Sequence, residues 1–334
     1  METPPAAHDA APPAIHTANF SADVGNDYEI PAPEAFSTFG ALKDRIKLHY
    51  ELASDYYYSL WGEHIHHGYF LSVSDTKEQA QVRLINLLLK KSGLAASSSV
   101  LDVGCGIGGT SRHLAKNHGC KVTGVTISGR QVEIAEKITR EVAGAVAEEK
   151  ADASGFMKLG DGAVRYVELD AEKMGDYFTT APNEATFDYV WISEAMSHLP
   201  DKTLFFRNAA KLLKKGGKLV VADWFKAEAL TSAQMDADIK PIEDGMLLPP
   251  LCAQPEYVEH AKQAGLGVFS EPFDISEDVS KTWDISWSLV QSPALWAFAI
   301  SQGRDGLAFL QAFRAMRRGY ANGTFRYAVM VFQK

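Results

Sequence analysis

Val100-Leu-Asp-Val-Gly-Cys-Gly-Ile-Gly-Gly-Thr-Ser-Arg-His-Leu-Ala115 is the stretch of this sequence that decides the fold. A short apolar run ends at Asp102, closely spaced glycines follow, and a helix-like segment comes next. Glycine permits positive φ angles and lets a ligand approach the bare backbone. The start of a helix adds free N–H groups and partial positive charge. This strand–turn–helix order is typical of sites that bind the nucleotide part of a cofactor.

Strand-like and helix-like patterns alternate around this stretch and predict a parallel sheet with helices on both faces. The expected strands are residues 98–103, 121–126, 164–169, 187–193 and 218–223. The expected helices in this region are residues 109–117, 129–147 and 202–215. The polar segment 147–163 is expected to be a surface excursion. Later segments are expected to be helices at 229–248 and 255–264, a strand at 265–273, further helix, and a final strand at 324–333.

The segments before the sheet differ in composition. Residues 1–36 are rich in Ala and Pro and are expected to be a disordered arm. Residues 37–97 are expected to form a helical N-terminal cap with a polar turn near Ser72–Asp75, after which Thr76 begins a capped helix that runs to Lys91. The arm has no features of a signal or transit peptide. Its composition leaves a role in a homodimer open.

Composition excludes several classes of function. The net charge of −9 over 334 residues disfavours nucleic acid and anionic membranes as partners, and no apolar run is long enough to span a membrane. Three cysteines are too few for a disulfide framework and predict a reducing, cytoplasmic location. His64-Ile-His66-His67 has the spacing of metal ligands, but no second cluster accompanies it, so we expect no metal.

Two cofactors compete for the glycine turn. A nicotinamide dehydrogenase needs G-x-G-x-x-G and an acid at the end of the second strand. Here the second strand reads Val122-Thr-Gly-Val-Thr-Ile-Ser128 without an acid. S-adenosyl-L-methionine is the alternative, with its amino-acid end held at the glycine turn and Asp102 fixing the site.

Ordered blocks of sequence favour the second cofactor. They are Tyr58–Gly68, Leu101–Gly109, Val125–Gln131, Glu168–Glu172, Phe187–Lys202, Pro249–Cys252 and Met316–Lys334. In these blocks the chain resembles the class I S-adenosylmethionine-dependent methyltransferases. More narrowly, it is similar to the group that contains the plant tocopherol methyltransferases and indole-alkaloid N-methyltransferases. The sterol and cyclopropane-forming enzymes are more distant relatives. The resemblance covers roughly residues 45 to 334.

The resemblance implies an α/β fold, a Rossmann-like seven-stranded sheet whose last strand is antiparallel, with a helical N-terminal segment and a helical lid. The S-adenosylmethionine-binding core then spans 98–228, and the lid helices at 229–334 interleave with the last two core strands. It also implies S-adenosyl-L-methionine as cofactor and S-adenosyl-L-homocysteine as product. The expected cofactor-binding residues are Tyr58, Trp61, Asp102, Gly104, Cys105, Gly106, Gly108, Thr126, Ser128, Gln131, Asp170, Ala171 and Ser193.

Methyl transfer depends mainly on alignment and exclusion of water, and a base is needed only when the nucleophile loses a proton. His198, just past the fourth strand, is expected to be that base or a hydrogen-bond partner of the acceptor. Glu194 is the other catalytic candidate, because a carboxylate can steady an amine or take a proton. Each has an alternative structural role. The expected substrate-binding residues are His66, His67, Trp283 and Trp287.

The expected reaction is N-methylation of a small, fairly hydrophobic secondary metabolite, derived from an alkaloid or a peptide. C-methylation of an aromatic or isoprenoid acceptor is the next possibility. A cyclase with this fold, which uses the bound cofactor only as a charge, and a non-catalytic binding protein are the alternatives from other classes.

Overall fold

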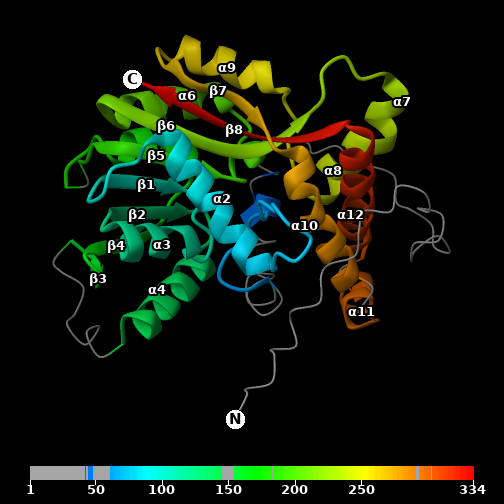
Figure 1. Ribbon diagram of the computed structural model, residues 1–334, viewed down its shortest axis with the longest axis horizontal. Coiled ribbons are helices and arrows are strands. Elements are labelled where there is room, and N and C mark those ends of the chain that lie inside the picture. Colours follow the sequence, from blue (N-terminus) through cyan, green and yellow to red (C-terminus); the bar gives the residue numbers. More distant parts are fainter. Residues whose placement is uncertain are drawn as a thin grey trace.

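The structure, a computed structural model, describes residues 61–144, 154–182, 184–290, 293–301 and 303–334, together with residue 42 and residues 44–47. The arm predicted at 1–36 lies outside these residues. The strands of the described residues are β1 Ser99–Val103, β2 Lys121–Thr126, β3 Met157–Leu159, β4 Gly162–Glu168, β5 Phe187–Ser193, β6 Leu213–Lys226, β7 Gly267–Asp274 and β8 Phe325–Gln333. They form one sheet of order β3-β4-β2-β1-β5-β6-β8-β7 (Figure 1).

The predicted Rossmann-like sheet is confirmed. β4, β2, β1, β5 and β6 are parallel, and β8 pairs antiparallel with both β6 and β7. The sheet has eight strands rather than seven, because β3 pairs antiparallel with β4 inside the segment predicted as a surface excursion. The two strands are joined at Gly160-Asp161, where Gly160 takes a φ of 61° that suits a tight hairpin turn.

The helices that cover the sheet and extend beyond it are α2 Lys77–Ser92, α3 Gly109–His118, α4 Gly129–Ala143, α5 Met174–Tyr177, α6 Lys202–Leu212, α7 Ser232–Gln234, α8 Lys240–Gly245, α9 Gln254–Gln263, α10 Ser276–Val290, α11 Pro293–Ser301 and α12 Arg304–Asn322. As predicted, Thr76 begins α2, in a reciprocal capping box with Gln79.

Three helical predictions differ from the structure. The helix expected at 202–215 ends at Leu212, because Leu213 begins β6 and pairs with Phe187. The helix expected at 229–248 is divided into α7, a π-helical segment at Met235–Ile239, and α8. In the expected helical cap, residues 62–76 are irregular, and Asp75 holds this loop by accepting from the N–H groups of Leu71 and Ser72 at 2.8 Å each.

Apolar side chains bury both faces of the sheet. One cluster lies under α2, α3 and α4 and continues into α10 and α12, and the other lies under α6 and α9. Figure 1 shows α8, α10, α11 and α12 gathered beyond one end of the sheet. These helices come from the connections between β6, β7 and β8, so the sheet and the helical region are interleaved in sequence.

Candidate active site

An open cavity lies at the carboxyl ends of β1, β2, β4 and β5, with about 1160 Å³ of empty space that is partly open to solvent. In doubly wound α/β folds this edge of the sheet is where ligands bind. Twelve of the predicted site residues line it: His66, Asp102, Gly104, Cys105, Gly106, Thr126, Gln131, Asp170, Ala171, Ser193, Glu194 and His198. The sheet therefore brings most of the predicted site to one place.

The glycine turn after β1 shapes the floor of the cavity. Gly104 has a φ of 72°, and a Cβ built there would lie 2.2 Å from the Cβ of Ala195. Gly106 also has positive φ, but a Cβ there would enter open space. The N–H groups of Gly104 and Cys105 both donate to the Val125 carbonyl, at 2.8 and 3.0 Å. These two amides therefore hold the turn against β2 and are not the groups that receive a ligand.

Asp102 is a buried carboxyl in the wall of the cavity. Its Oδ2 accepts a hydrogen bond of 2.5 Å from the Ser111 hydroxyl, in the first turn of α3. Burial raises the pKa of Asp102 to about 6, although the hydrogen bond from Ser111 opposes this rise. Burial also raises the pKa of Cys105 well above its usual value, so this thiol is not an activated nucleophile.

The ends of β2 and β4 supply the next part of the wall. The Thr126 hydroxyl donates to the Gln131 side chain at 2.5 Å, and both line the cavity. Asp170 begins the short 3₁₀ helix Ala171–Lys173 and accepts from the Glu172 N–H. Ser128 caps α4 and lies outside the cavity lining. Gly108 also lies outside it, because the Tyr166 ring covers the position of its missing side chain.

His64 and His66 enter the cavity from the segment before α2. Gln81 of α2 holds this segment by donating to the carbonyls of both histidines. Burial, and then the charges of His66, His113 and Arg112, lower the pKa of His64 to about 2. Burial also lowers the pKa of His66, although the Glu194 charge opposes this. Both imidazoles are therefore neutral at neutral pH.

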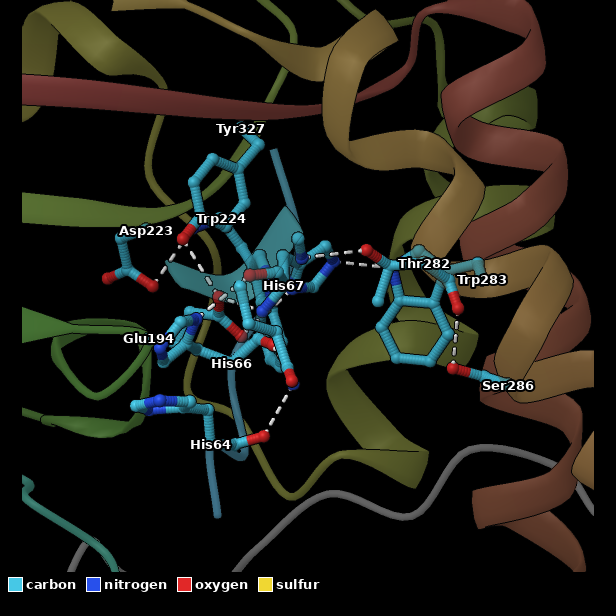
Figure 2. A network of polar contacts seen from close by, with 12 residues as sticks. His64, His66, His67, Glu194, Asp223, Trp224, Thr282, Trp283, Ser286 and Tyr327 are labelled. Carbon is cyan, nitrogen blue, oxygen red and sulfur yellow. Dashed lines mark hydrogen bonds and ion pairs between the residues drawn. The ribbon is translucent and has the colours of Figure 1, made fainter. Parts of the chain in front are cut away.

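His67 and Glu194 form a buried pair behind the cavity. Figure 2 shows His67 between Glu194, at the end of β5, and Trp283 of α10. Its Nδ1 lies 2.9 Å from Glu194 Oε2, and its backbone N–H donates to Oε1 at 2.7 Å. The Trp283 indole N–H donates to His67 Nε2 at 2.7 Å, and the Tyr327 hydroxyl donates to Glu194 Oε1 at 2.8 Å. The pair thus links the N-terminal segment, the sheet and α10.

These bonds restrict what Glu194 can do. Both carboxylate oxygens already accept hydrogen bonds from His67, and one accepts from Tyr327 as well. Burial alone would raise the pKa of Glu194, but the charge and hydrogen bonds of His67 outweigh it and leave the pKa below its usual value. A saturated carboxylate with a lowered pKa is a poor proton acceptor. The geometry therefore favours a positioning role for Glu194.

The other predicted site residues differ in their position relative to the cavity. His198 ends a short 3₁₀ helix at the cavity wall, with its ring 6.1 Å from that of Trp224. His67, Trp283 and Trp287 do not line the cavity. Trp287 packs with Ala299 and Leu310 of α11 and α12. Trp61 lies beside Lys77, and Tyr58 lies outside the described residues.

Sequence reasoning missed several residues of this site. His64 lines the cavity, although its motif had suggested only a metal site, and Thr110, Leu199 and Pro200 also line it. Among the described residues, no group of three or more His, Cys, Asp or Glu side chains is arranged to hold a metal ion. Within the same part of the chain, every helix is too short or too polar to cross a membrane.

Comparisons with known proteins agree with this geometry. Residues 75–248 match the family described as "Methyltransferase domain". The probable chloroplastic tocopherol O-methyltransferase of Oryza sativa subsp. japonica is 28% identical over 88% of this chain and 78% of its own length. The 27-O-demethylrifamycin SV methyltransferase of Amycolatopsis mediterranei (strain S699) is 32% identical over 72% of this chain and 78% of its own length.

A solved structure shares the fold. The mycolic acid cyclopropane synthase CmaA1, solved with SAH and CTAB, superposes with a TM-score of 0.69 at 20% identity, over 87% of this chain and 98% of that one. The family match covers more than half of the chain, and the cavity lies where that fold binds its ligands. The chain therefore belongs to the methyltransferase domain family, with the Rossmann-like fold of the class I enzymes.

Proposed function

We propose that this protein transfers the methyl group of S-adenosylmethionine to a small, hydrophobic acceptor that carries a hydroxyl group. The observation that carries the proposal is the cavity at the carboxyl edge of the sheet, where the glycine turn, Asp102 and the Thr126–Gln131 pair lie together in a chain of this family. The cofactor supplies an activated methyl group when it is bound. The chain's own residues orient the two reactants and exclude water.

The residues of the cavity fit such a cofactor. The open space above Gly106 lets a ligand approach the backbone closely. Asp102, Gln131 and Asp170 are polar side chains on the wall that can receive hydroxyl and amino groups. Ile107, Ile127 and Leu169 provide the apolar surface between them.

Two relatives support oxygen as the methylated atom, because the printed names of both are those of oxygen-methylating enzymes. Methylation of nitrogen, which the sequence had led us to expect, stays a prediction and is the second outcome to test. We further propose that the segment before α2 closes over the cofactor, and that α8, α10, α11 and α12 form the lid over the acceptor. The segment before α2 supplies Glu63, His64, Ile65 and His66 to the cavity lining.

The test has two stages. Isothermal titration calorimetry with S-adenosylhomocysteine and S-adenosylmethionine should give saturable binding, and NADH should give none. The protein is then incubated with methyl-labelled S-adenosylmethionine and a panel of alkylated hydroquinones, chromanols, macrocyclic polyketide alcohols and indole amines. Label in an ether product supports the proposal, and label only in amines would move the reaction to nitrogen. Absence of binding in the first stage would overturn the proposal.

The same incubation separates the alternative functions. A rearranged product without label, formed only when the cofactor is bound, would indicate a cyclase with this fold. Binding without any product would indicate a non-catalytic protein. Gly106→Asn is a useful control, because asparagine tolerates the positive φ of this position better than most side chains and would project into the open cavity. It should abolish both binding and label transfer.

A further inference from the structure

His66 presents an unusual group to the cavity. The side chain is 8% exposed, yet it belongs to the cavity lining. Its Nε2 is buried and has no hydrogen-bond partner among the described residues. A buried polar atom without a partner is costly, so an unmatched atom in a ligand cavity points to a group that the ligand supplies.

The backbone determines which kind of group this is. His66 Nδ1 lies 2.8 Å from the His67 carbonyl oxygen, which can only accept a hydrogen bond. Nδ1 must therefore carry the proton. Because the pKa of His66 is lowered and the ring is neutral, Nε2 carries none. Nε2 of this cavity-lining residue thus has a free lone pair, able to accept a hydrogen bond or a proton.

Charged and polar groups around the His66 ring affect its pKa. The Glu194 charge favours protonation of His66, as does the bond to the His67 carbonyl, while the His67 side chain disfavours it. The His64 and His113 rings, which lie beyond it toward α3, are electrostatically coupled to it, and their own pKa values are lowered. Burial is the largest effect, and it disfavours the charged ring. A proton taken up by His66 during a reaction would be stabilised by Glu194 and released readily afterwards.

The other candidates near His66 are less suited to accept a proton. Glu194 is saturated by His67 and Tyr327. The Nε2 of His67 is occupied by the Trp283 indole, and His67 does not line the cavity. The pKa of about 2 makes His64 too weak a base. Of the groups at this end of the cavity, His66 combines a free lone pair with a suitable position.

We propose that His66 Nε2 accepts the proton that the acceptor hydroxyl loses during methyl transfer. The hydroxyl oxygen forms a bond to the methyl carbon, the carbon–sulfur bond breaks, and its electron pair remains on sulfur as a neutral thioether. The hydroxyl proton passes to Nε2, which gives an imidazolium beside Glu194. This step rests on the proposed function, because it needs an acceptor that carries an acidic proton.

Kinetics with the panel acceptor that gives the most labelled ether test this role. For the unaltered protein, kcat should fall below a pKa that lies under 6.5, because protonated His66 cannot act as a base. His66→Gln should lower kcat roughly 100-fold or more and should remove this acidic limb. If that acceptor is a phenol, its ring-nitrated analogue ionises without a base and should lose much less rate in His66→Gln than the parent phenol does.

Two variants provide controls. His66→Asn keeps an amide donor at the position of Nδ1 for the His67 carbonyl and removes the group at Nε2. It should therefore show the same loss of kcat and of the acidic limb, and it provides the test if the Gln variant folds poorly. His113→Gln removes a nearby histidine that does not line the cavity, and it should keep the acidic limb. Calorimetry with S-adenosylhomocysteine should give nearly unchanged affinity for His113→Gln and still saturable binding for the two His66 variants, which separates this proposal from failure of the proposed function.

A spectroscopic readout needs no acceptor. ¹⁵N-labelled histidine in the S-adenosylhomocysteine complex should show His66 at pH 7 as the Nδ1–H tautomer, with an unprotonated Nε2. Protonation of Nε2 at this pH would overturn the proposal. So would an acidic limb that persists in His66→Gln and disappears in His198→Gln, because His198 would then be the base.

Discussion

Asp102 is a buried acid whose surroundings favour its protonated form. The carboxyl has a pKa of about 6 in the folded protein against an ordinary value of 3.8, mainly because of burial. Its contribution to stability is therefore fully present below about pH 3.8 and is lost as the pH rises through 6. The ionised form of Asp102 thus destabilises the fold near neutral pH. We infer that this carboxyl serves ligand binding in the cavity that it lines.

Asp102→Asn should therefore stabilise the protein at high pH. An amide oxygen can still accept from Ser111, and it carries no charge to bury. We expect the free energy of unfolding to rise by on the order of 2 kcal/mol at pH 8, with little gain at pH 4. Urea unfolding at the two pH values measures this, while affinity for S-adenosylhomocysteine should fall. An equal effect at both pH values would contradict the assignment.

The residues of the site were predictable to the extent that they follow strands. Asp102, Thr126, Asp170 and Ser193 line the cavity, as expected from the rule that the carboxyl ends of parallel strands meet at one edge of the sheet. Gly108 and Ser128 do not line it, because the direction of a residue within a turn depends on dihedral angles that spacing does not give. The partners of Glu194 could not be predicted, since Tyr327 is 133 positions away along the chain.

At the scale of elements, α12 is fixed by arginines that pair with buried acids. Arg318 donates to Asp238 of the π-helical segment at 2.6 Å, and Arg304 donates to Asp244 of α8 at 2.8 Å. Asp238 also accepts from the side chains of Asn322 and Thr324. Strand and helix types in the sheet region were predictable from hydrophobic period. The break of 229–248 into α7, π-helix and α8 was not, because no residue pattern marks where Asp238 must turn inward.

Asp238→Ala should lower the free energy of unfolding by about 3 kcal/mol or more, because a buried pair loses its acid and three donors lose their acceptor. Asp236→Ala is the matched control in the same segment. Asp236 is exposed and forms an ion pair with Lys240, so its loss should cost much less. Chemical denaturation of both variants provides the comparison, and similar losses would refute the idea that Asp238 anchors α12.

The Trp283 indole joins α10 to the buried His67–Glu194 pair. Trp283→Phe keeps an aromatic ring but removes the donor to His67 Nε2, so a buried acceptor loses this partner. We expect a loss of about 1 to 3 kcal/mol and a weaker affinity for the acceptor. Trp287→Phe on the same helix removes an indole N–H that has no partner among the described residues, and should cost clearly less. Thermal melts of the two variants measure both losses. A larger loss in Trp287→Phe than in Trp283→Phe would show that the volume of the ring, and not the hydrogen bond, determines the stability.

Across the whole molecule, buried histidines and buried acids act on acid stability in opposite directions. The pKa values of His64 and His113 are lowered to about 2 and about 4, so the unfolded chain takes up protons there first and acid destabilises the fold. The pKa values of Asp102 and Asp223 are raised to about 6, so the folded chain takes up protons there first and acid stabilises it. The two sets partly offset each other between pH 4 and 7.

Removing one histidine should disturb this balance. His64→Gln cannot take up a proton when the chain unfolds, so between pH 7 and 5 it should lose on the order of 1 to 2 kcal/mol less stability than the unaltered protein. Urea unfolding across this range measures the difference. Parallel curves for the two proteins would show that His64 titrates normally in the folded state.

A cytoplasmic location and a homodimer stay predictions.

The place of β8 has a consequence for how the protein is made. This strand comes last among the eight and lies between β6 and β7, which pair with it but not with each other. Nascent β6, a strand of 14 residues, therefore has one unpaired edge while residues 227–324 are synthesised. A translation product that stops before Phe325 would keep that edge exposed to aggregation and to chaperones. Completion of the sheet therefore has to wait until the residues of β8 have been synthesised.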